Sequence, residues 1–428
     1  MATQFSINDG IKWKPRFFSI YIGQALSLLG SQLVGFALIW HLTETTGSVI
    51  VLTISTLVVT VPRVILSPFI GPLVDRWDRR VMMIIADTVI AIATIVLAVM
   101  FSLGSVEIWQ IYLIMFIRAA AGAFHGNSMS ASTSLMVPVE HLTRVQGINQ
   151  MLYGGLSIVA APLGAILLGL LDMQWILAMD VVTASIAILP LFFFAIPQPD
   201  RKTSQELSGE TSSYWSDLKI GLKYVYSWKG LLIILGMAAM INMVLTPAFS
   251  FMPLIISDHF GMGAIELGTI ESMFGIGIII GGALLGVWGG FKKNIYTTMM
   301  GLAGLGIGIF GFGVIDEGGY YIAIGLSLLM GIFQPITNGS LMGMMQKKVS
   351  PDMQGRVFSL VGSIAGGMAP IGLIVAGPLS EVYGIQIWYV VGGIMCVLMA
   401  IFGMLNPHVR NFEDFESGSG QISEVPAE

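Results

Sequence analysis

The chain has 428 residues, of which 55% are hydrophobic and only 11% are charged, and its mean hydropathy is +0.83. Soluble domains carry about 25% charged residues, so this composition excludes a water-soluble globule with one core. The formal net charge of −5 indicates no class of partner. The single cysteine, Cys396, excludes an intramolecular disulfide and a thiolate metal cluster.

The chain begins with a polar segment, residues 1–16, and then enters an apolar run, Phe17–Trp40. This run is too long for the core of a signal peptide and no small-residue cleavage site follows it, so we expect a retained helix. Apolar runs of about 20 residues suit helices that cross about 30 Å of hydrocarbon. Five more precede residue 197: Val49–Val74, Val81–Leu103, Ile108–Met136, Val145–Leu171 and Trp175–Ile196.

A polar stretch, residues 197–213, separates these six runs from a second set of six. Lipid leaves only helices and closed barrels as spanning structures, and runs this long are not barrel strands. The sequence therefore predicts an all-α integral membrane protein with twelve transmembrane helices in two six-helix halves. The second set is Leu231–Ile256, Ala264–Gly289, Ile295–Ile315, Tyr320–Met345, Val357–Leu379 and Ile387–Leu405.

Four segments follow from this division. They are an N-terminal half over residues 1–196, a cytoplasmic linker over 197–230, a C-terminal half over 231–410 and an acidic, disordered tail over 411–428. Within the linker, residues 214–229 carry apolar side chains at helical spacing and lysines off that face. We expect an amphipathic helix on the cytoplasmic surface; a soluble linker helix is the alternative.

Basic residues set the orientation. The turns are numbered in order between successive apolar runs. Lysine and arginine occupy the termini, the linker and the even-numbered turns, including the second turn with Arg76, Arg79 and Arg80. The odd-numbered turns contain aspartate and glutamate but no lysine or arginine. Cytoplasmic loops of membrane proteins are enriched in lysine and arginine. Both termini and the linker are therefore expected in the cytoplasm.

The two halves repeat one another at an offset near 210 residues. Residues 161–164, Ala-Pro-Leu-Gly, align with residues 369–372, Ala-Pro-Ile-Gly, and three further matches occur in the same order. Arg118 aligns with Ser327, so the second half lacks this charge. Parallel repeats of six helices are a known plan of transporters, with the substrate site near the midplane between the halves.

The second turn carries a recognisable signature. Residues 71–80 resemble the loop motif of the major facilitator superfamily, G-x-L-x-D-R-x-G-R-[RK], although Asp78 stands where that family usually has glycine. Arg118-x-x-x-Gly122 is similar to the arginine motif of its fourth helix. Phe124-His125, Leu142-Thr143 and Gln354–Ser359 look like the macrolide-efflux branch, and siderophore exporters share much of that pattern.

This resemblance implies the major facilitator fold and a secondary active transporter that exports amphipathic, macrolide-like molecules by proton antiport with alternating access. No G-x-x-x-x-G-K-[ST] loop occurs, so we expect a proton gradient as the energy source. We expect no cofactor, metal, enzymatic activity or nucleic-acid partner. We also expect a functional monomer in the plasma (inner) membrane of a bacterium. The alternatives are an exporter of a dedicated metabolite such as a siderophore, and a non-transporting sensor or lipid scramblase on the same fold.

The resemblance also implies that helices 1, 4, 7 and 10 line the substrate cavity. The candidates on these helices are Gln24, Gln32, Arg118, Asn127, Asn242, Phe249, Gln334 and Asn338. Glutamine and asparagine in membrane helices often bond only to neighbouring helices, which is the alternative for each amide. We expect Arg118, near the midplane, to be unpaired and functional.

Proton antiport needs titratable groups inside the membrane, where charge is expensive and usually functional. The candidates are Glu271, Asp180, Arg118 and His125, with Glu271 preferred as the only carboxylate well inside a second-half helix. A packing role for His125 remains open. Asp87 is expected to pair with Arg63 or with the basic residues of the second turn.

Conformational gating is assigned to the second turn and to the start of the eleventh helix. We expect the carboxylate of Asp75 to cap that helix near Gln354–Val357 when the cytoplasmic side is closed, because a helix N-terminus attracts negative charge. The gating residues are then Gly71, Asp75, Arg76, Arg79, Arg80 and Arg356.

The topology can be tested by cysteine labelling. We expect Ser208→Cys and Ser417→Cys to react only with reagents that reach the cytoplasm, and Thr45→Cys to react from outside. Labelling of Ser208→Cys by an impermeant external reagent in intact cells would overturn the orientation.

Overall fold

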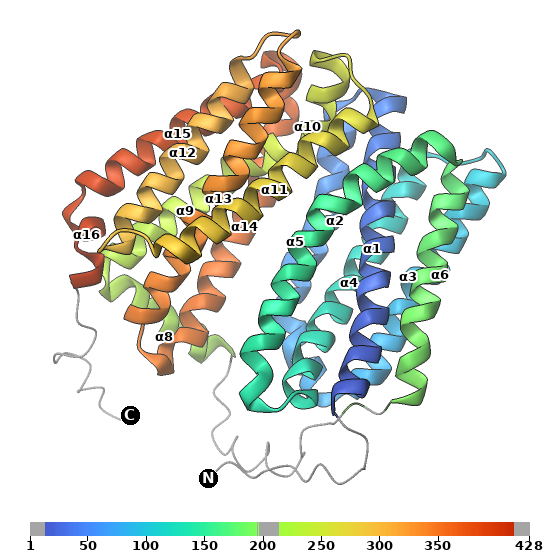
Figure 1. Cartoon of the computed structure of the whole chain (residues 1–428), viewed down its shortest axis with the longest axis horizontal. Coiled ribbons are helices and arrows are strands. Elements are labelled where there is room, and N and C mark those ends of the chain that lie inside the picture. The colour runs from blue at the N-terminus through green and yellow to red at the C-terminus, as the bar shows by residue number, and fades with distance from the viewer. Residues whose placement is uncertain (1–12, 195, 197–213, 415–428) are drawn as a thin grey trace. The chain divides into compact units, whose positions relative to one another are not determined.

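The computed structural model describes residues 13–194, 196 and 214–414, and these residues form helices and turns without a strand. Within these ranges, twelve helices are long and apolar enough to cross a membrane, which confirms the predicted number (Figure 1). The chain divides into two compact units. The N-terminal unit comprises Met1–Thr45 and Ile54–Leu207, and the C-terminal unit comprises Thr46–Thr53 and Ser208–Glu428.

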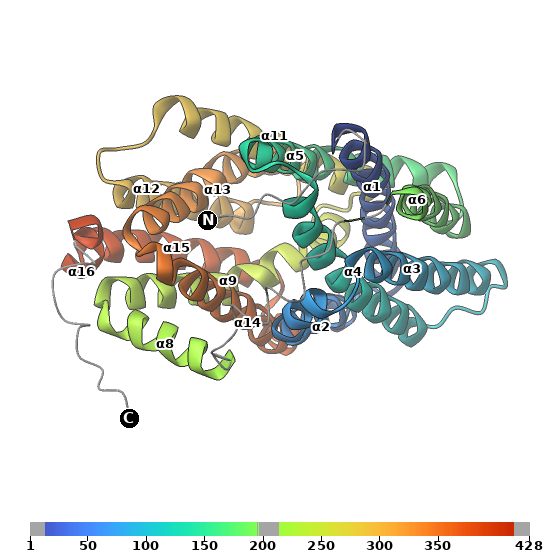
Figure 2. The same ribbon diagram turned by 90° about the horizontal axis from the view of Figure 1, so that it is seen from below.

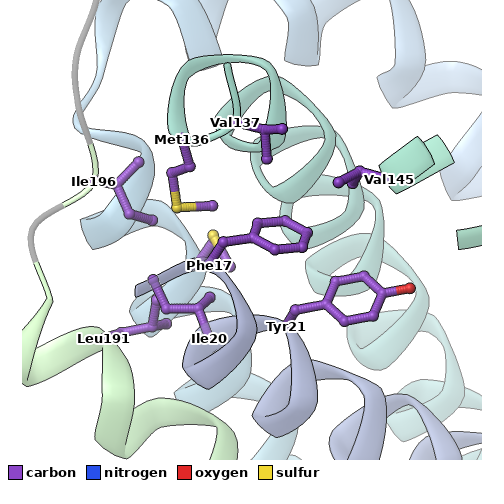
Figure 3. Close-up of a cluster of buried hydrophobic side chains, with 9 residues drawn as sticks. Phe17, Ile20, Tyr21, Met136, Val137, Val145, Leu191 and Ile196 are labelled. Carbon is purple, nitrogen blue, oxygen red and sulfur yellow. The ribbon is translucent and has the colours of Figure 1, made fainter. Parts of the chain in front are cut away.

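The N-terminal unit contains six long helices, with α3 packed against both α4 and α6. An apolar cluster at one end of the bundle joins the start of α1 to the ends of α4 and α6 (Figure 3). The rings of Phe17 and Tyr21 stack there with centroids 5.2 Å apart. The helices are α1 (Trp13–Thr46), α2 (Val49–Arg76), α3 (Arg79–Ser102), α4 (Ile108–Met136), α5 (Val139–Leu170) and α6 (Met173–Phe193).

The turn between α2 and α3 fastens α3 to its neighbours. Asp78 is the N-cap of α3, because its side chain accepts hydrogen bonds from the backbone N–H groups of Arg80, at 2.9 Å, and Val81, at 3.3 Å. A cap of this kind stabilises a helix by about 0.5–2 kcal/mol. The guanidinium of Arg79 donates to the carbonyl of Ala131 on α4, and that of Arg80 donates to the carbonyl of Phe192 on α6, both at 2.9 Å. The departure from glycine at position 78 therefore supplies a helix cap.

The C-terminal unit repeats the helix pairing of the first. Its α12 packs against α13 and α15, as α3 packs against α4 and α6 (Figure 2). Likewise, α9 packs against α14 and α11 against α13. The elements are α8 (Tyr214–Ser227), α9 (Lys229–Ser250), α10 (Met252–Leu254), η1 (Ile255–His259), α11 (Ala264–Trp288), α12 (Asn294–Val314), α13 (Tyr320–Lys348), α14 (Pro351–Tyr383), α15 (Gln386–Leu405), α16 (Pro407–Arg410) and η2 (Phe412–Asp414).

Glycines allow the backbones of α11 and α13 to come into direct contact. A methyl group added to Gly277 would lie 2.8 Å from the Cα atom of Gly331, and one added to Gly281 would collide with the carbonyl of Ile332. Small residues at such crossings allow close van der Waals contact between membrane helices, where the hydrophobic effect gives no driving force. The glycine-rich stretch of α11 therefore serves helix packing.

The predicted linker helix is present as α8, which packs against α14. Its two lysines, Lys219 and Lys223, are exposed. The next helix begins at Lys229, slightly earlier than the predicted start of the second half at residue 231.

The start of the acidic tail is ordered, so the prediction of disorder from residue 411 is wrong for its first four residues. Phe412 is 1% exposed and its ring stacks on Trp228 at 4.2 Å. Glu413 accepts a hydrogen bond from the backbone N–H of Ile295 at 3.2 Å, at the start of α12. Asp414 accepts a hydrogen bond from Lys293 at 2.6 Å, which raises the pKa of that ammonium above its usual value. Residues 415–428 lie outside the described residues.

Two adjacent glycines of α11 provide a matched test of this packing. Gly281→Ala would force α11 away from α13, whereas a methyl group on Gly282 meets no atom within 4 Å. Overpacking costs about 1–3 kcal/mol, so we expect Gly281→Ala to lower the apparent unfolding temperature in detergent by roughly 2–10 °C. Gly282→Ala is expected to leave it unchanged. Equal effects of the two substitutions would refute the proposed close contact.

Candidate functional site

A buried charge pair lies in the middle of the N-terminal unit. Nη1 of Arg118, on α4, lies 2.5 Å from Oδ2 of Asp180, on α6. Asp180 is 0% exposed, and the hydroxyl of Thr94 on α3 donates to the same oxygen at 3.2 Å. Ser31 on α1 donates to the other oxygen at 3.1 Å. The expectation that Arg118 is unpaired is therefore wrong, because α6 supplies its counter-ion.

The close approach of α1 to α6 makes the fourth contact of this layer. A methyl group on Gly30 would lie 3.1 Å from Oδ1 of Asp180 and would collide with the hydroxyl of Thr183. Glycine at position 30 thus leaves room for the neighbouring Ser31 to reach the carboxylate. Four helices, α1, α3, α4 and α6, converge on one buried acid.

A second polar layer surrounds Asp87 on α3, which is 3% exposed. Nε2 of His125, on α4, lies 3.5 Å from Oδ1 of Asp87, and the amide of Gln24, on α1, donates to Oδ2 at 3.3 Å. Gln24 also lies 3.4 Å from the carbonyl of Ala187 on α6. The expected partners of Asp87 were Arg63 or the basic residues of the second turn, and this expectation is wrong. Arg63 is exposed.

The two layers are related by a spacing of seven residues on all four helices. Each residue of the first layer has its counterpart two turns along the same helix, about 10 Å away and on the same face. The pairs are Ser31 and Gln24, Thr94 and Asp87, Arg118 and His125, and Asp180 and Ala187. Sequence reasoning missed Ser31 and Thr94; polar residues seven apart recur on several helices, and this spacing identifies them once the neighbouring helices are known.

The C-terminal unit contains a pocket of about 540 Å³. Its walls come from α9, α11, α12 and α13, and none of its lining residues is acidic or basic. Four of the predicted cavity residues lie in it together: Asn242, Phe249, Gln334 and Asn338. The rings of Phe249 and Phe274 lie 5.7 Å apart at its wall. A volume of this size suits a small molecule, since such sites measure about 300–1,000 Å³.

Comparison with known proteins identifies the family. The family model described as Major Facilitator Superfamily matches residues 20–369 and, in a second match, residues 231–418. The chain belongs to the major facilitator superfamily. It is 32% identical over 401 residues to macrolide efflux protein A of Streptococcus pyogenes, covering 94% of this chain and 98% of that protein. It is 33% identical over 327 residues to macrolide efflux protein A of Enterococcus faecalis, covering 76% of this chain and 100% of that protein.

A solved structure shares the fold. The crystal structure of a bacterial homologue of the iron transporter ferroportin, in an inward-facing state, superposes with a TM-score of 0.68 at 16% identity. The superposition covers 92% of this chain and 99% of that one. Together with the twelve apolar helices, this confirms the predicted major facilitator fold and a multi-pass membrane protein.

The other predicted cavity residues lie in the N-terminal unit, outside this pocket, and their role in substrate binding stays a prediction. Gln24 and Arg118 belong to the buried polar layers, with their side chains bonded to neighbouring helices. Gln32 is exposed on α1. Asn127 is exposed on α4, and its amide donates to the carbonyl of Ala123 at 2.8 Å.

The predicted gating residues fall into two groups. Arg79 and Arg80 fasten α3, as described above, and Arg356 is half-buried on α14. The side chains of Gly71, Asp75 and Arg76, in α2, lie outside the described part of the chain, and the capping role of Asp75 stays a prediction.

The charge pair of the first layer can be tested by removing one partner or both. Removing one member of a buried ion pair costs about 3–5 kcal/mol, whereas replacing both by apolar residues is often neutral. We therefore expect Asp180→Asn to lower the unfolding temperature of the purified protein strongly. The double substitution of Asp180→Leu with Arg118→Met should recover most of the loss.

The control is Glu44→Gln, an exposed carboxylate at the end of α1, which should change nothing. An unchanged unfolding temperature for Asp180→Asn would show that the pair contributes no stability. A double variant as unstable as the single one would contradict the explanation by unpaired charge.

Proposed function

We propose that the protein exports amphipathic molecules of the macrolide type by proton antiport, with alternating access and no other cofactor. It acts as a monomer in the plasma (inner) membrane of a bacterium, with both termini in the cytoplasm, and it is not an enzyme. The substrate part of this proposal is supported by the two relatives named macrolide efflux protein A, which match this chain over 98% and 100% of their own length.

The position of Glu271 beside the pocket carries the proposal of proton coupling. Glu271 lies about 10 Å into α11 from the first residue of that helix, Ala264. Residues three apart on a helix are neighbours on one face, and Phe274, three residues further on, lines the pocket. A change of charge at Glu271 therefore occurs next to the space that a substrate would fill.

The partners of the membrane carboxylates favour the same residue. Asp180 and Asp87 each have a basic partner and further hydrogen-bond donors. The half-buried Glu271 has no hydrogen-bond donor or ion-pair partner among the described residues. Charge inside a membrane is expensive and, where it occurs, usually functional. Among these three acids, Glu271 is the one whose protonation disturbs no contact with a basic side chain.

The proposal predicts a separation of binding from transport. We expect Glu271→Gln to abolish uphill efflux in proteoliposomes, because a neutral amide cannot release a proton. Substrate binding should remain nearly intact but lose its dependence on pH. Macrolide efflux under an imposed pH gradient and equilibrium binding at several pH values measure the two effects.

Glu381→Gln, at an exposed carboxylate near the end of α14, is the matched control and should transport normally. Uphill efflux at the wild-type rate by Glu271→Gln would remove Glu271 as the coupling site and shift the proposal to Asp180. Absence of any proton-driven macrolide efflux by the unaltered protein would refute the proposed function itself.

A further inference from the structure

We propose that the pocket of the C-terminal unit binds the neutral, hydroxyl-bearing lactone face of a macrolide-like molecule, and not its amino sugar. This inference rests on the proposed function for its choice of ligand. The pocket itself is lined entirely by residues of one unit, including four from α12. That helix is not among the four that the family resemblance assigns to the cavity.

The absence of charge in the lining selects for a neutral group. The pocket is walled by aliphatic, aromatic, amide and hydroxyl side chains, without an acidic or basic one. An ammonium group placed there would lose its hydration and would meet no charged side chain of the lining, since Glu271 is not one of the lining residues, and this loss is costly in an apolar site. An uncharged lactone face meets no such cost.

Three of the four hydroxyl groups in the wall are arranged to accept hydrogen bonds. Ser250, Thr298 and Thr337 each donate their proton to the backbone carbonyl four residues earlier, at 2.8, 3.1 and 2.9 Å. The amide of Asn242 likewise donates to the carbonyl of Ala238 at 2.9 Å. Only the oxygen lone pairs of these three hydroxyl groups remain for a ligand, whereas Asn242 keeps its carbonyl oxygen and one N–H group. The wall therefore matches a molecule that carries several hydroxyl donors.

Two amides supply the complementary donors. Gln334 and Asn338 are four residues apart on α13 and thus lie on one face of it, and both line the pocket. Neither makes a hydrogen bond with another described residue. Their N–H groups are available to carbonyl oxygens such as those of a lactone or ketone. Phe249 and Phe274 provide the apolar surface for the ring itself.

The test compares a tritiated 14-membered macrolide with its sugar-free, uncharged aglycone as a competitor. Binding is measured at one pH to the full-length protein in lipid nanodiscs. We expect the aglycone to displace the macrolide. We expect Gln334→Leu and Asn338→Leu each to weaken aglycone and parent macrolide by the same factor, about tenfold, which corresponds to one lost hydrogen bond.

Two further variants are compared with these: one removes an acceptor of the pocket wall, and one is a control outside the pocket. Thr298→Val keeps the shape of the side chain and removes one acceptor, so it should weaken both ligands by a smaller, equal factor. Gln346→Leu removes an exposed amide of α13 that does not line the pocket, and it should change neither affinity. Unfolding temperatures of the variants identify any that fold poorly.

Failure of the aglycone to compete would overturn the inference. So would a loss confined to the parent macrolide in Gln334→Leu, Asn338→Leu and Thr298→Val, since the pocket would then hold the sugar. These outcomes are independent of transport. If the protein binds the aglycone as described but shows no proton-driven efflux, the proposed function is wrong and the inferred binding site is still supported.

Discussion

The buried ion pair between Arg118 and Asp180 organises the N-terminal unit. A carboxylate with no exposed surface is stable only when its charge is matched and its lone pairs are occupied. Here α1, α3 and α4 each donate a hydrogen bond to the one acid on α6. The same four helices meet again around Asp87, two turns away. Because each contact depends on helix register, a shift of one helix along its axis would break contacts in both layers. The two layers therefore fix the register of α1, α3, α4 and α6 together.

The C-terminal unit has the same helix pairing but reaches it by other means. The position that aligns with Arg118 is Ser327, which is buried and brings no charge. Close helix contact comes instead from glycines, as at Gly277 and Gly331 between α11 and α13. The pocket of this unit is lined without an acidic or basic side chain. The two units thus share the helix pairing but differ in chemistry, with a buried charge pair in the first and an uncharged pocket in the second.

Much of this architecture could be predicted from the sequence. The lengths of the apolar runs predicted the twelve helices, since only helices and closed barrels satisfy a backbone in lipid and the runs are too long for barrel strands. The repeat of residues 161–164 at 369–372 indicated the equivalent pairing of the halves. The partners of Arg118 and Asp87 could not be predicted, because seven-residue spacing becomes informative only when neighbouring helices are known. The contribution of α12 to the pocket and the ordered contact of Phe412 also depend on tertiary packing.

The central claim is that a proton site and a ligand pocket are linked within one protein. The most direct measurement is proton release on ligand binding, followed with a pH-sensitive dye in weakly buffered detergent solution across roughly pH 5 to 8. We expect a macrolide to release protons in proportion to pocket occupancy, with saturation at full binding. Saturable binding without proton exchange at every pH in that range would contradict it.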